Sequence, residues 1–263
     1  MNFSHTFVIC AYKESPYLEE CIKSLQAQTL KSQVIMVTST PCEFLDEISR
    51  RYQIPLIVNP GPGGIVEDWN FGYHQVKTPY LTLAHQDDLY YEGYTEHFCQ
   101  GVQRARKKAL IFFSDYVEIR QGQVVKENKL LKIKRLMLLP LRPKIFSSNR
   151  FIRRRILSFG SPICCPSVGY ARENLPETIF SRGFISNQDW EAWERLSKLK
   201  GDFLYDPEAL VAHRIHEAST TTEIISEHGR SKEDAIMYRK FWPKWIANLL
   251  VRAYAKGQDS NQL

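Results

Sequence analysis

PYLTLAHQDD occupies residues 79–88 and joins an apolar run to two adjacent carboxylates. The run at residues 79–84 is typical of a buried β-strand, and Asp87 and Asp88 follow where that strand would reach the surface. Adjacent carboxylates repel each other and resist desolvation, and a divalent cation such as Mg²⁺ or Mn²⁺ removes that cost. A solvated acidic turn is the simpler interpretation of the pair taken alone, so the rest of the chain has to decide between them.

The chain around this stretch alternates between strand and helix patterns. Apolar runs predict strands at residues 7–11, 34–37, 56–58, 79–84 and 110–113. Helical spacing of apolar residues predicts helices over 16–28, 43–52, 66–76 and 92–108. Such alternation is typical of a largely parallel sheet with helices on both faces, where ligands bind beyond the carboxyl ends of the strands. We therefore expect the residues that follow these strands to line one crevice: Tyr12, Lys13, Glu14, Thr38, Ser39, Asn59 and residues 85–88.

The alternation breaks after residue 120. A basic segment there predicts an amphipathic surface helix followed by a loop. Further on, we expect strands at 167–171, 203–205 and 209–212, a helix over 187–199, and a helical C-terminal stretch over 238–254.

Size and composition indicate an ordinary globular chain with one main core. The chain has 263 residues, of which 43% are hydrophobic and 24% charged. The N-terminus lacks the pattern of a signal peptide, and no apolar run approaches the roughly 20 residues that span a bilayer. Six cysteines without a paired C-x-x-C spacing predict reduced thiols in a cytoplasmic protein.

The positive charge is concentrated in residues 126–155, which hold eleven Lys and Arg and one acid, Glu127. This segment favours a phosphate-rich partner, and a solvated basic face is the alternative. Because no nucleic-acid motif accompanies it, we expect no nucleic acid partner. Peripheral contact with an anionic membrane at its inner, cytoplasmic face ranks above nucleic acid, with Arg153, Arg154 and Arg155 as contacts, and a solvated face has equal weight.

Six motifs occur in order along residues 5–222. They are Tyr12-Lys13-Glu14, Ser24-Leu25-Gln26-Ala27-Gln28, Glu67-Asp68-Trp69-Asn70, His85-Gln86-Asp87-Asp88, Asn187-Gln188-Asp189-Trp190 and His213-Arg214-Ile215-His216-x-x-Ser219. Each is weak alone, but the ordered set resembles the inverting nucleotide-sugar glycosyltransferases of family 2. The resemblance implies the GT-A fold, an α/β Rossmann-type sandwich whose mostly parallel central sheet is flanked by helices. It also implies a catalytic domain over 1–222, divided into a nucleotide-binding half (1–115) and an acceptor half (116–222), and a helical extension over 223–263.

The same resemblance implies an activity and a set of site residues. The activity is a metal-dependent, inverting transfer of a sugar from a UDP- or dTDP-linked donor to a glycan or lipid-linked acceptor, in the synthesis of a surface polysaccharide. Asp87 and His216 would bind Mn²⁺ or Mg²⁺, which neutralises the departing diphosphate, and Asp189 would take the proton of the acceptor hydroxyl. The expected donor-contacting residues are Ala11, Tyr12, Glu14, Thr38, Asn70, Gln86, Asp87 and Arg214.

Each of these residues also has a structural alternative. Asp189 could cap its helix in the pattern Ser186-x-x-Asp189, His216 could be an ordinary histidine, and Trp69 could floor a sugar pocket or fill the core. The chain departs from the family at Thr38-Ser39, where an acid is usual, at Lys13 and at His85. These departures leave a catalytically silent sugar-nucleotide or glycan-binding module as the alternative function. Nucleotidyl transfer is disfavoured because the first turn lacks a glycine-rich phosphate loop.

Overall fold

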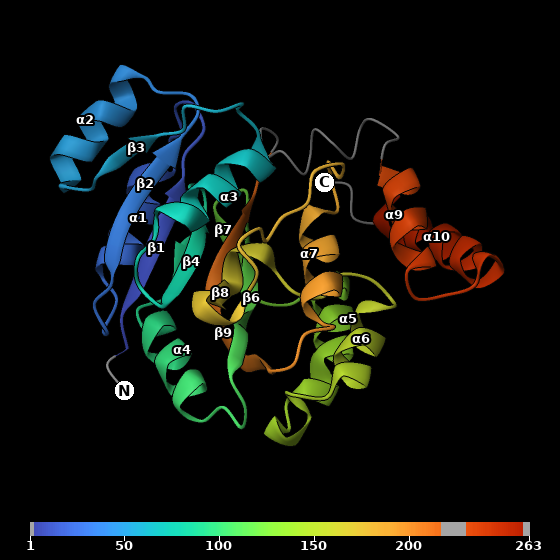
Figure 1. Cartoon of the computed structure of the whole chain (residues 1–263). Helices are drawn as coiled ribbons and strands as arrows, with labels where there is room; N and C mark the ends of the chain where they lie inside the picture. Colours follow the sequence, from blue (N-terminus) through green and yellow to red (C-terminus); the bar gives the residue numbers. More distant parts are fainter. Residues whose placement is uncertain (1–2, 217–229, 260–263) are drawn as a thin grey trace.

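The computed structural model describes residues 3–216 and 230–259, which form one nine-stranded sheet with helices on both faces (Figure 1). The first part of the chain comprises β1 (His5–Cys10), α1 (Leu18–Gln26), β2 (Gln33–Thr38), α2 (Glu43–Tyr52), β3 (Leu56–Val58), α3 (Ile65–Gln75), β4 (Tyr80–His85), β5 (Leu89–Tyr90) and α4 (Tyr94–Gln103). The second part comprises β6 (Ala109–Arg120), β7 (Gln123–Val125), α5 (Lys129–Leu138), α6 (Arg150–Leu157), β8 (Val168–Ala171), α7 (Gln188–Leu196), β9 (Asp202–Ile215), α9 (Arg230–Arg239) and α10 (Lys244–Asp259).

The sheet has the strand order β3-β2-β1-β4-β8-β6-β9-β5, with β7 paired to β6. The strands β3, β2, β1 and β4 are parallel, as predicted for the first half. Beyond them the sheet is mixed, because β8 runs antiparallel to both β4 and β6, while β9 is parallel to β6. This topology brings the carboxyl ends of β1, β2, β4 and β9 to one edge of the sheet, although β9 is far from the others in sequence.

Two hydrophobic cores cover the two faces of the sheet, because successive side chains of a strand point to opposite faces. From β1, Phe7 and Ile9 pack in a core with side chains of α1, α2 and α4. Val8, between them, packs on the other face, in a core with side chains of α3, α6, α7 and α9. The predicted α/β sandwich is thus confirmed.

Several element boundaries differ from the predictions. β6 continues to Arg120, and the two strands expected at 203–212 form one strand, β9, which follows β6 through register shifts at Ser114 and Asp115. A helix, α6, replaces part of the expected loop, and the Asn149 side chain caps it by accepting from two backbone N–H groups. The predicted C-terminal helix is interrupted: α9 ends at Arg239 and α10 begins at Lys244. Pro243, which lacks a backbone N–H, lies in the turn between them.

The predicted domain boundaries stay predictions. The one at 115–116 falls within β6, and the one at 222–223 lies outside the described residues. Among the residues described, no helix is both long enough and apolar enough to span a bilayer. All six cysteines carry free thiols, each buried or half-buried.

Candidate functional site

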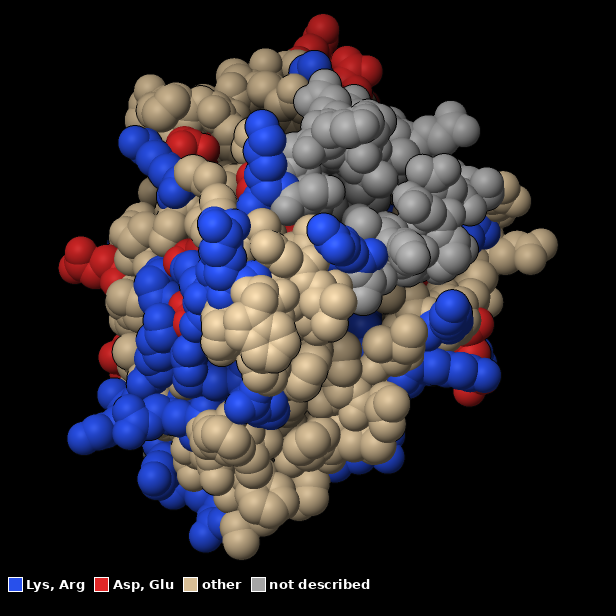
Figure 2. All heavy atoms as spheres, turned by 90° about the vertical axis from the view of Figure 1, so that its right-hand side faces the viewer, with Lys and Arg blue, Asp and Glu red and all other residues tan. Residues whose placement is uncertain are grey.

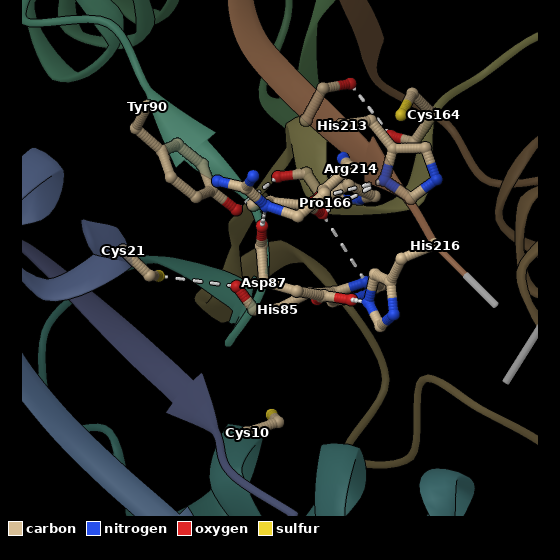
Figure 3. A network of polar contacts seen from close by, with 12 residues as sticks. Cys10, Cys21, His85, Asp87, Tyr90, Cys164, Pro166, His213, Arg214 and His216 are labelled. Carbon is tan, nitrogen blue, oxygen red and sulfur yellow. Dashed lines mark hydrogen bonds and ion pairs between the residues drawn. The ribbon is translucent and has the colours of Figure 1, made fainter. Parts of the chain in front are cut away.

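The loops that follow β1 and β4 are tied together at the shared edge of the sheet, where Figure 3 shows the Asp87 side chain facing His216. The Gln86 side-chain oxygen accepts from the Tyr12 backbone N–H at 3.0 Å, and its amide donates to the Tyr12 carbonyl at 3.0 Å. Next in the chain, Lys13 adopts the left-handed conformation at φ 53° and donates its backbone N–H to Thr40. These bonds place the predicted residues Ala11, Tyr12 and Gln86 next to one another. The Ala11 side chain is buried, whereas Tyr12 and Glu14 are exposed.

The two adjacent aspartates occupy different environments. Asp88 is fully buried; it accepts from the His213 ring at 2.9 Å and from the Arg214 backbone N–H at 2.8 Å. Burial alone would raise the pKa of Asp88, but His213 and the Arg214 N–H hold it below its usual value. The Asp87 side chain is partly exposed, and its Oδ2 lies 2.9 Å from the His216 Nε2. Asp88 therefore joins β9 to the loop after β4, and Asp87 is the carboxylate available to a ligand.

Asp87 belongs to a cluster of side chains that could bind a metal ion. Side-chain donor atoms of His85, Asp87 and Asp88 all lie within 4.8 Å of one another. The His85 Nε2 is buried and, among the described residues, has no hydrogen-bond partner, while its Nδ1 faces Asp88 at 3.8 Å. Burial lowers the pKa of His85, although Asp88, Asp87 and, more weakly, Asp189 act in the opposite direction. A neutral imidazole with an unused ring nitrogen beside a carboxylate fits a divalent cation.

His85 departs from the family pattern, and its residue type and position alone did not predict it as a ligand. The apolar run before it made its burial foreseeable, but the missing partner at Nε2 depends on the folded arrangement.

His216 and Arg214, at the end of β9, contact Asp87 from the other side of the cluster. His216 and Asp87 are 129 residues apart in sequence, and the fold brings their side chains into contact; their predicted role as ligands of one metal ion stays a prediction. The Arg214 guanidinium lies 4.2 Å from the Tyr17 ring centroid and donates to the Asp87 carbonyl at 2.9 Å and to Glu20 at 2.7 Å. Arg214 thus holds the loop that carries Asp87, and its contact with a donor phosphate stays a prediction. Ser219, the last residue of the motif, lies outside the described residues.

A carboxylate also reaches the ends of β2 and β3, where the sequence departs from the family. Asp68 of α3 accepts from the Ser39 hydroxyl at 2.6 Å and from the Asn59 amide at 2.8 Å. Thr38 is fully buried and accepts from the Thr40 backbone N–H at 3.0 Å. Asp68 was not predicted as a site residue, because the family pattern places the acid directly after β2. The motif Glu67-Asp68-Trp69-Asn70 contained the signal that could have identified it.

Asp189 lies in the first turn of α7. Its Oδ2 accepts from the Ser161 hydroxyl at 3.4 Å, and its charge acts on the pKa of His85. The capping-box interpretation of Ser186 is wrong, because α7 has Asn187 at its N-cap; the Ser186 hydroxyl instead donates to Glu233 of α9 at 2.7 Å. Glu233 also accepts from the backbone N–H groups of residues 185–187, so that α9 caps this turn.

Aromatic and amide side chains of α3 form the remaining wall. The Trp69 ring stacks on the His85 ring, with 5.1 Å between their centroids, and its centroid lies 4.7 Å from that of the Phe180 ring. Trp69 therefore contacts both the site and the core. Asn70 bonds to the backbone of residues 179–180 and borders a hollow of about 410 Å³ that Phe180 also lines. Its donor contact stays a prediction. Trp190 and Trp193 are fully buried, as expected of core residues.

Comparisons with known proteins agree with this arrangement. A family model described as glycosyl transferase family 2 matches residues 6–172. An uncharacterized glycosyltransferase of Rickettsia typhi is 24% identical over 228 residues, which cover 84% of this chain and 67% of that protein.

Two solved structures show the same fold. TarS of S. aureus, in complex with UDP-GlcNAc, has a TM-score of 0.62 at 14% identity and covers 95% of this chain and 70% of its own. The mannosyltransferase PcManGT of Pyrobaculum calidifontis, in complex with GDP-Man and Mn²⁺, has a TM-score of 0.59 at 13% identity, with 97% and 70% covered. Because the family model spans more than half of its length, the chain belongs to glycosyl transferase family 2 and is a glycosyltransferase with the GT-A fold.

Proposed function

We propose that this glycosyltransferase is metal-dependent and inverting. It moves a sugar from a nucleotide-sugar donor to a glycan or lipid-linked acceptor, in the synthesis of a surface polysaccharide on the cytoplasmic side of a membrane. The free thiols of all six cysteines support a reducing compartment. The structures similar in fold hold UDP-GlcNAc in one case and GDP-Man in the other, so the search for the donor has to extend beyond UDP and dTDP sugars.

One observation carries the proposal. Ligand atoms from two distant parts of the chain, Asp87 after β4 and His216 after β9, meet at 2.9 Å. His85, whose Nε2 has no partner among the described residues, offers a ligand atom within 4.8 Å of one on Asp87. The Asp189 carboxylate comes from another element, α7, and its charge acts to raise the pKa of His85. A transferase that releases a diphosphate needs both a cation site and a base, and a silent binding module has no use for the base.

In this proposal, some side chains bind the cation, others position the loops of the site, and one accepts a proton. Asp87, with His85 and His216, would hold a divalent cation, which as a Lewis acid neutralises charge on the leaving diphosphate. Arg214 and Asp88 fix the loop that bears Asp87, and Gln86 fixes the Tyr12 turn on which the nucleotide would rest. Asp189 accepts the proton of the acceptor hydroxyl as that oxygen attacks the anomeric carbon, and a single displacement inverts the configuration there.

The ligand chemistry favours Mn²⁺ over Mg²⁺. Mg²⁺ prefers oxygen ligands and near-ideal octahedral geometry, whereas imidazole nitrogens suit softer transition metals. Two imidazoles, those of His85 and His216, lie beside the single accessible carboxylate of Asp87. We therefore expect Mn²⁺ to support faster turnover than Mg²⁺ at equal concentration.

The test is release of nucleoside diphosphate from a panel of UDP, dTDP and GDP sugars, with Mn²⁺ or EDTA. We expect slow release from one donor, lost in EDTA and in the variants Asp87→Asn and Asp189→Asn. Asp46→Asn, which changes an exposed acid on α2, is the matched control. Nucleotide-dependent stabilisation against heat without turnover of any donor or acceptor would instead support the silent binding module.

A further inference from the structure

Large apolar side chains are exposed together on one side of the molecule. This side is formed by α5, two 3₁₀ turns (Leu139–Leu141 and Lys144–Phe146), α6, α9 and α10 (Figure 1); we call it the α5–α10 face. Its exposed apolar residues are Ile133, Leu136, Leu139, Ile145, Phe146, Phe151, Phe159, Ile236, Trp245 and Leu249. Phe151 is 69% exposed and Trp245 is 72% exposed. Large apolar side chains that gather on one exposed side of a protein mark an interaction site.

Positive charge surrounds these apolar side chains. Figure 2 shows Lys and Arg gathered beside a broad uncharged area on this side of the molecule. The exposed cations are Lys126, Lys129, Lys132, Arg142, Lys144, Arg150, Arg155, Lys232, Arg239, Lys244 and Arg252. Within residues 126–159 and 232–252, the one exposed acid is Glu127, which pairs with Lys132 at 3.2 Å.

The structure separates these cations from those with internal roles. Arg153 is buried and donates to the carbonyls of Ser197, Leu199 and Gly201. Arg154 pairs with the buried Glu194 at 2.6 Å. Of the three arginines that the sequence suggested as contacts, Arg155 alone is exposed, so neutralising all three would test folding instead of docking.

Direct contacts join α6 to the start of α10 in one surface. The Arg155 guanidinium lies 5.4 Å from the Phe151 ring centroid and 4.6 Å from that of Trp242. Trp242 donates its indole N–H to the Ser158 carbonyl at 2.8 Å, and its ring lies 5.6 Å from that of Phe159. On α10, Trp245 and Leu249 are four residues apart and lie on the same side of the helix.

This face continues to the predicted acceptor side of the site. Phe159 is two residues before Ser161, whose hydroxyl contacts Asp189. Trp190, next to Asp189, donates its indole N–H to the Leu157 carbonyl at the end of α6 at 2.9 Å. A surface that binds this face would therefore lie beside the carboxylate proposed to activate the acceptor; this spatial argument rests on the proposed function.

We propose that the α5–α10 face docks on an anionic lipid membrane, with Phe151, Trp245 and Leu249 among the headgroups and the surrounding cations on lipid phosphates. Aromatic and aliphatic side chains flanked by Lys and Arg match the interfacial zone of a bilayer, where tryptophan is enriched. A second copy of this chain fits less well, since a two-fold contact through this face would set like charges against each other. A nucleic acid would leave the aliphatic side chains without a partner.

The test is cosedimentation of the full chain with vesicles of equal parts phosphatidylglycerol and phosphatidylcholine, compared with phosphatidylcholine alone. We expect binding to the anionic vesicles that weakens with salt. In the variant Lys129→Gln/Lys144→Gln/Arg150→Gln, the partition coefficient onto anionic vesicles should fall roughly a hundredfold, because each cation removed weakens binding about fivefold. Phe151→Ser/Trp245→Ser should also lose most of the binding. Arg104→Gln/Lys107→Gln/Lys108→Gln removes the same charge from exposed positions between α4 and β6 and should bind as the unchanged chain does.

Three results would overturn the docking proposal. One is an equal loss in the control variant, which would indicate non-specific attraction. Another is loss of binding to a single-stranded RNA in the charge variant, with vesicle binding unchanged in all variants. The third is a dimer in solution that Phe151→Ser/Trp245→Ser dissociates, without vesicle binding. Donor hydrolysis away from membranes should be unchanged in all these variants, so failure of docking is distinguishable from failure of the proposed activity.

Discussion

At the scale of single residues, burial assigns different tasks to two neighbouring aspartates. Asp88 has no exposed surface, and its charge is compensated by His213 and a backbone N–H. Asp87 shares its carboxylate with His216 in a partly exposed position. A sequence shows that both residues are acids, but it does not show which of them the end of β9 will cover.

The substitutions Asp87→Asn and Asp88→Asn should therefore have opposite signatures. Asp87→Asn should lower turnover by about a hundredfold or more, because cation binding is weakened, and leave the melting temperature nearly unchanged. Asp88→Asn should lower the free energy of unfolding by about 3 kcal/mol, because it breaks a buried ion pair. Urea unfolding and donor hydrolysis measured on both variants separate the two roles; a large stability loss in Asp87→Asn would contradict them.

His5 predicts a pH dependence of stability. Its ring is buried between the Ser32 and Thr82 hydroxyls, and burial lowers its pKa from 6.5 to about 3. The unfolded chain takes up this proton first, so the stability is full above pH 6.5 and falls as the pH drops toward 3. The slope from this residue is about 1.4 kcal/mol per pH unit. In urea unfolding at several pH values, His5→Gln should show a flatter decline than the unchanged chain, and parallel curves would contradict the assignment.

At the scale of elements, α9 holds the turn from which Asp189 projects. Glu233 of α9 accepts from three consecutive backbone N–H groups of residues 185–187 and from the Ser186 hydroxyl. Burial alone would raise the pKa of Glu233, but these donors hold it below its usual value. We interpret Glu233 as a positioning residue for α7.

Glu233→Ala should lower kcat about tenfold with little change in KM for the donor, since it loosens the proposed base without touching the nucleotide. The free energy of unfolding should fall by about 2 kcal/mol from the lost charge-assisted bonds. Glu233→Gln, which keeps one acceptor oxygen, should recover part of kcat, and the exposed neighbour Lys232→Ala is the control. An unchanged kcat in Glu233→Ala would show that α9 has no part in positioning.

The distance of α3 from the sheet depends on Gly72. A Cβ at this position would lie 2.8 Å from the Val8 side chain and 3.1 Å from that of Val37. Alanine normally favours a helix over glycine by about 1 kcal/mol, yet here overpacking should outweigh that gain and cost about 2 kcal/mol net. Chemical unfolding of Gly72→Ala tests this, with His74→Ala, an exposed site on the same helix, as the control. A stabilised Gly72→Ala would show that the packing is loose.

Local patterns predicted some elements well and others poorly. α2 and β3 were predicted residue for residue because each has a clear period and a polar or glycine-rich boundary. β6 was predicted to end at residue 113, where the apolar run ends. Ser114, Asp115 and Glu118 continue the strand and are buried. Asp115 bonds to Arg135 and Glu118 to Asn128, which lie ten or more residues further along the chain. Long-range pairing of this kind is not visible in a local window.

At the scale of the whole molecule, the topology of the sheet explains how much of the site could be predicted. Because parallel strands end at one edge, the order of β1, β2 and β4 was sufficient to group Tyr12, Thr38 and Asp87. That His216 joins them depends on β9 running parallel to β6, and the motif resemblance, not the strand pattern, anticipated it. Three features required the three-dimensional structure, because each depends on contacts across the fold. They are the His85 nitrogen that has no partner within 3–216 and 230–259, the carboxylate of Asp68 and the cap from Glu233.

The central claim is that the residues at the ends of β4 and β9, Asp87 and His216, complete one cation-dependent donor site. The most direct test is a calorimetric titration of the donor's nucleoside diphosphate in the presence and absence of Mn²⁺, with the unchanged chain, Asp87→Asn, His216→Gln and the exposed control His74→Gln. We predict that Mn²⁺ tightens nucleotide binding, and that this gain falls at least roughly tenfold in both site variants but not in His74→Gln. Mn²⁺-dependent binding that is equally tight in all four proteins would contradict the account.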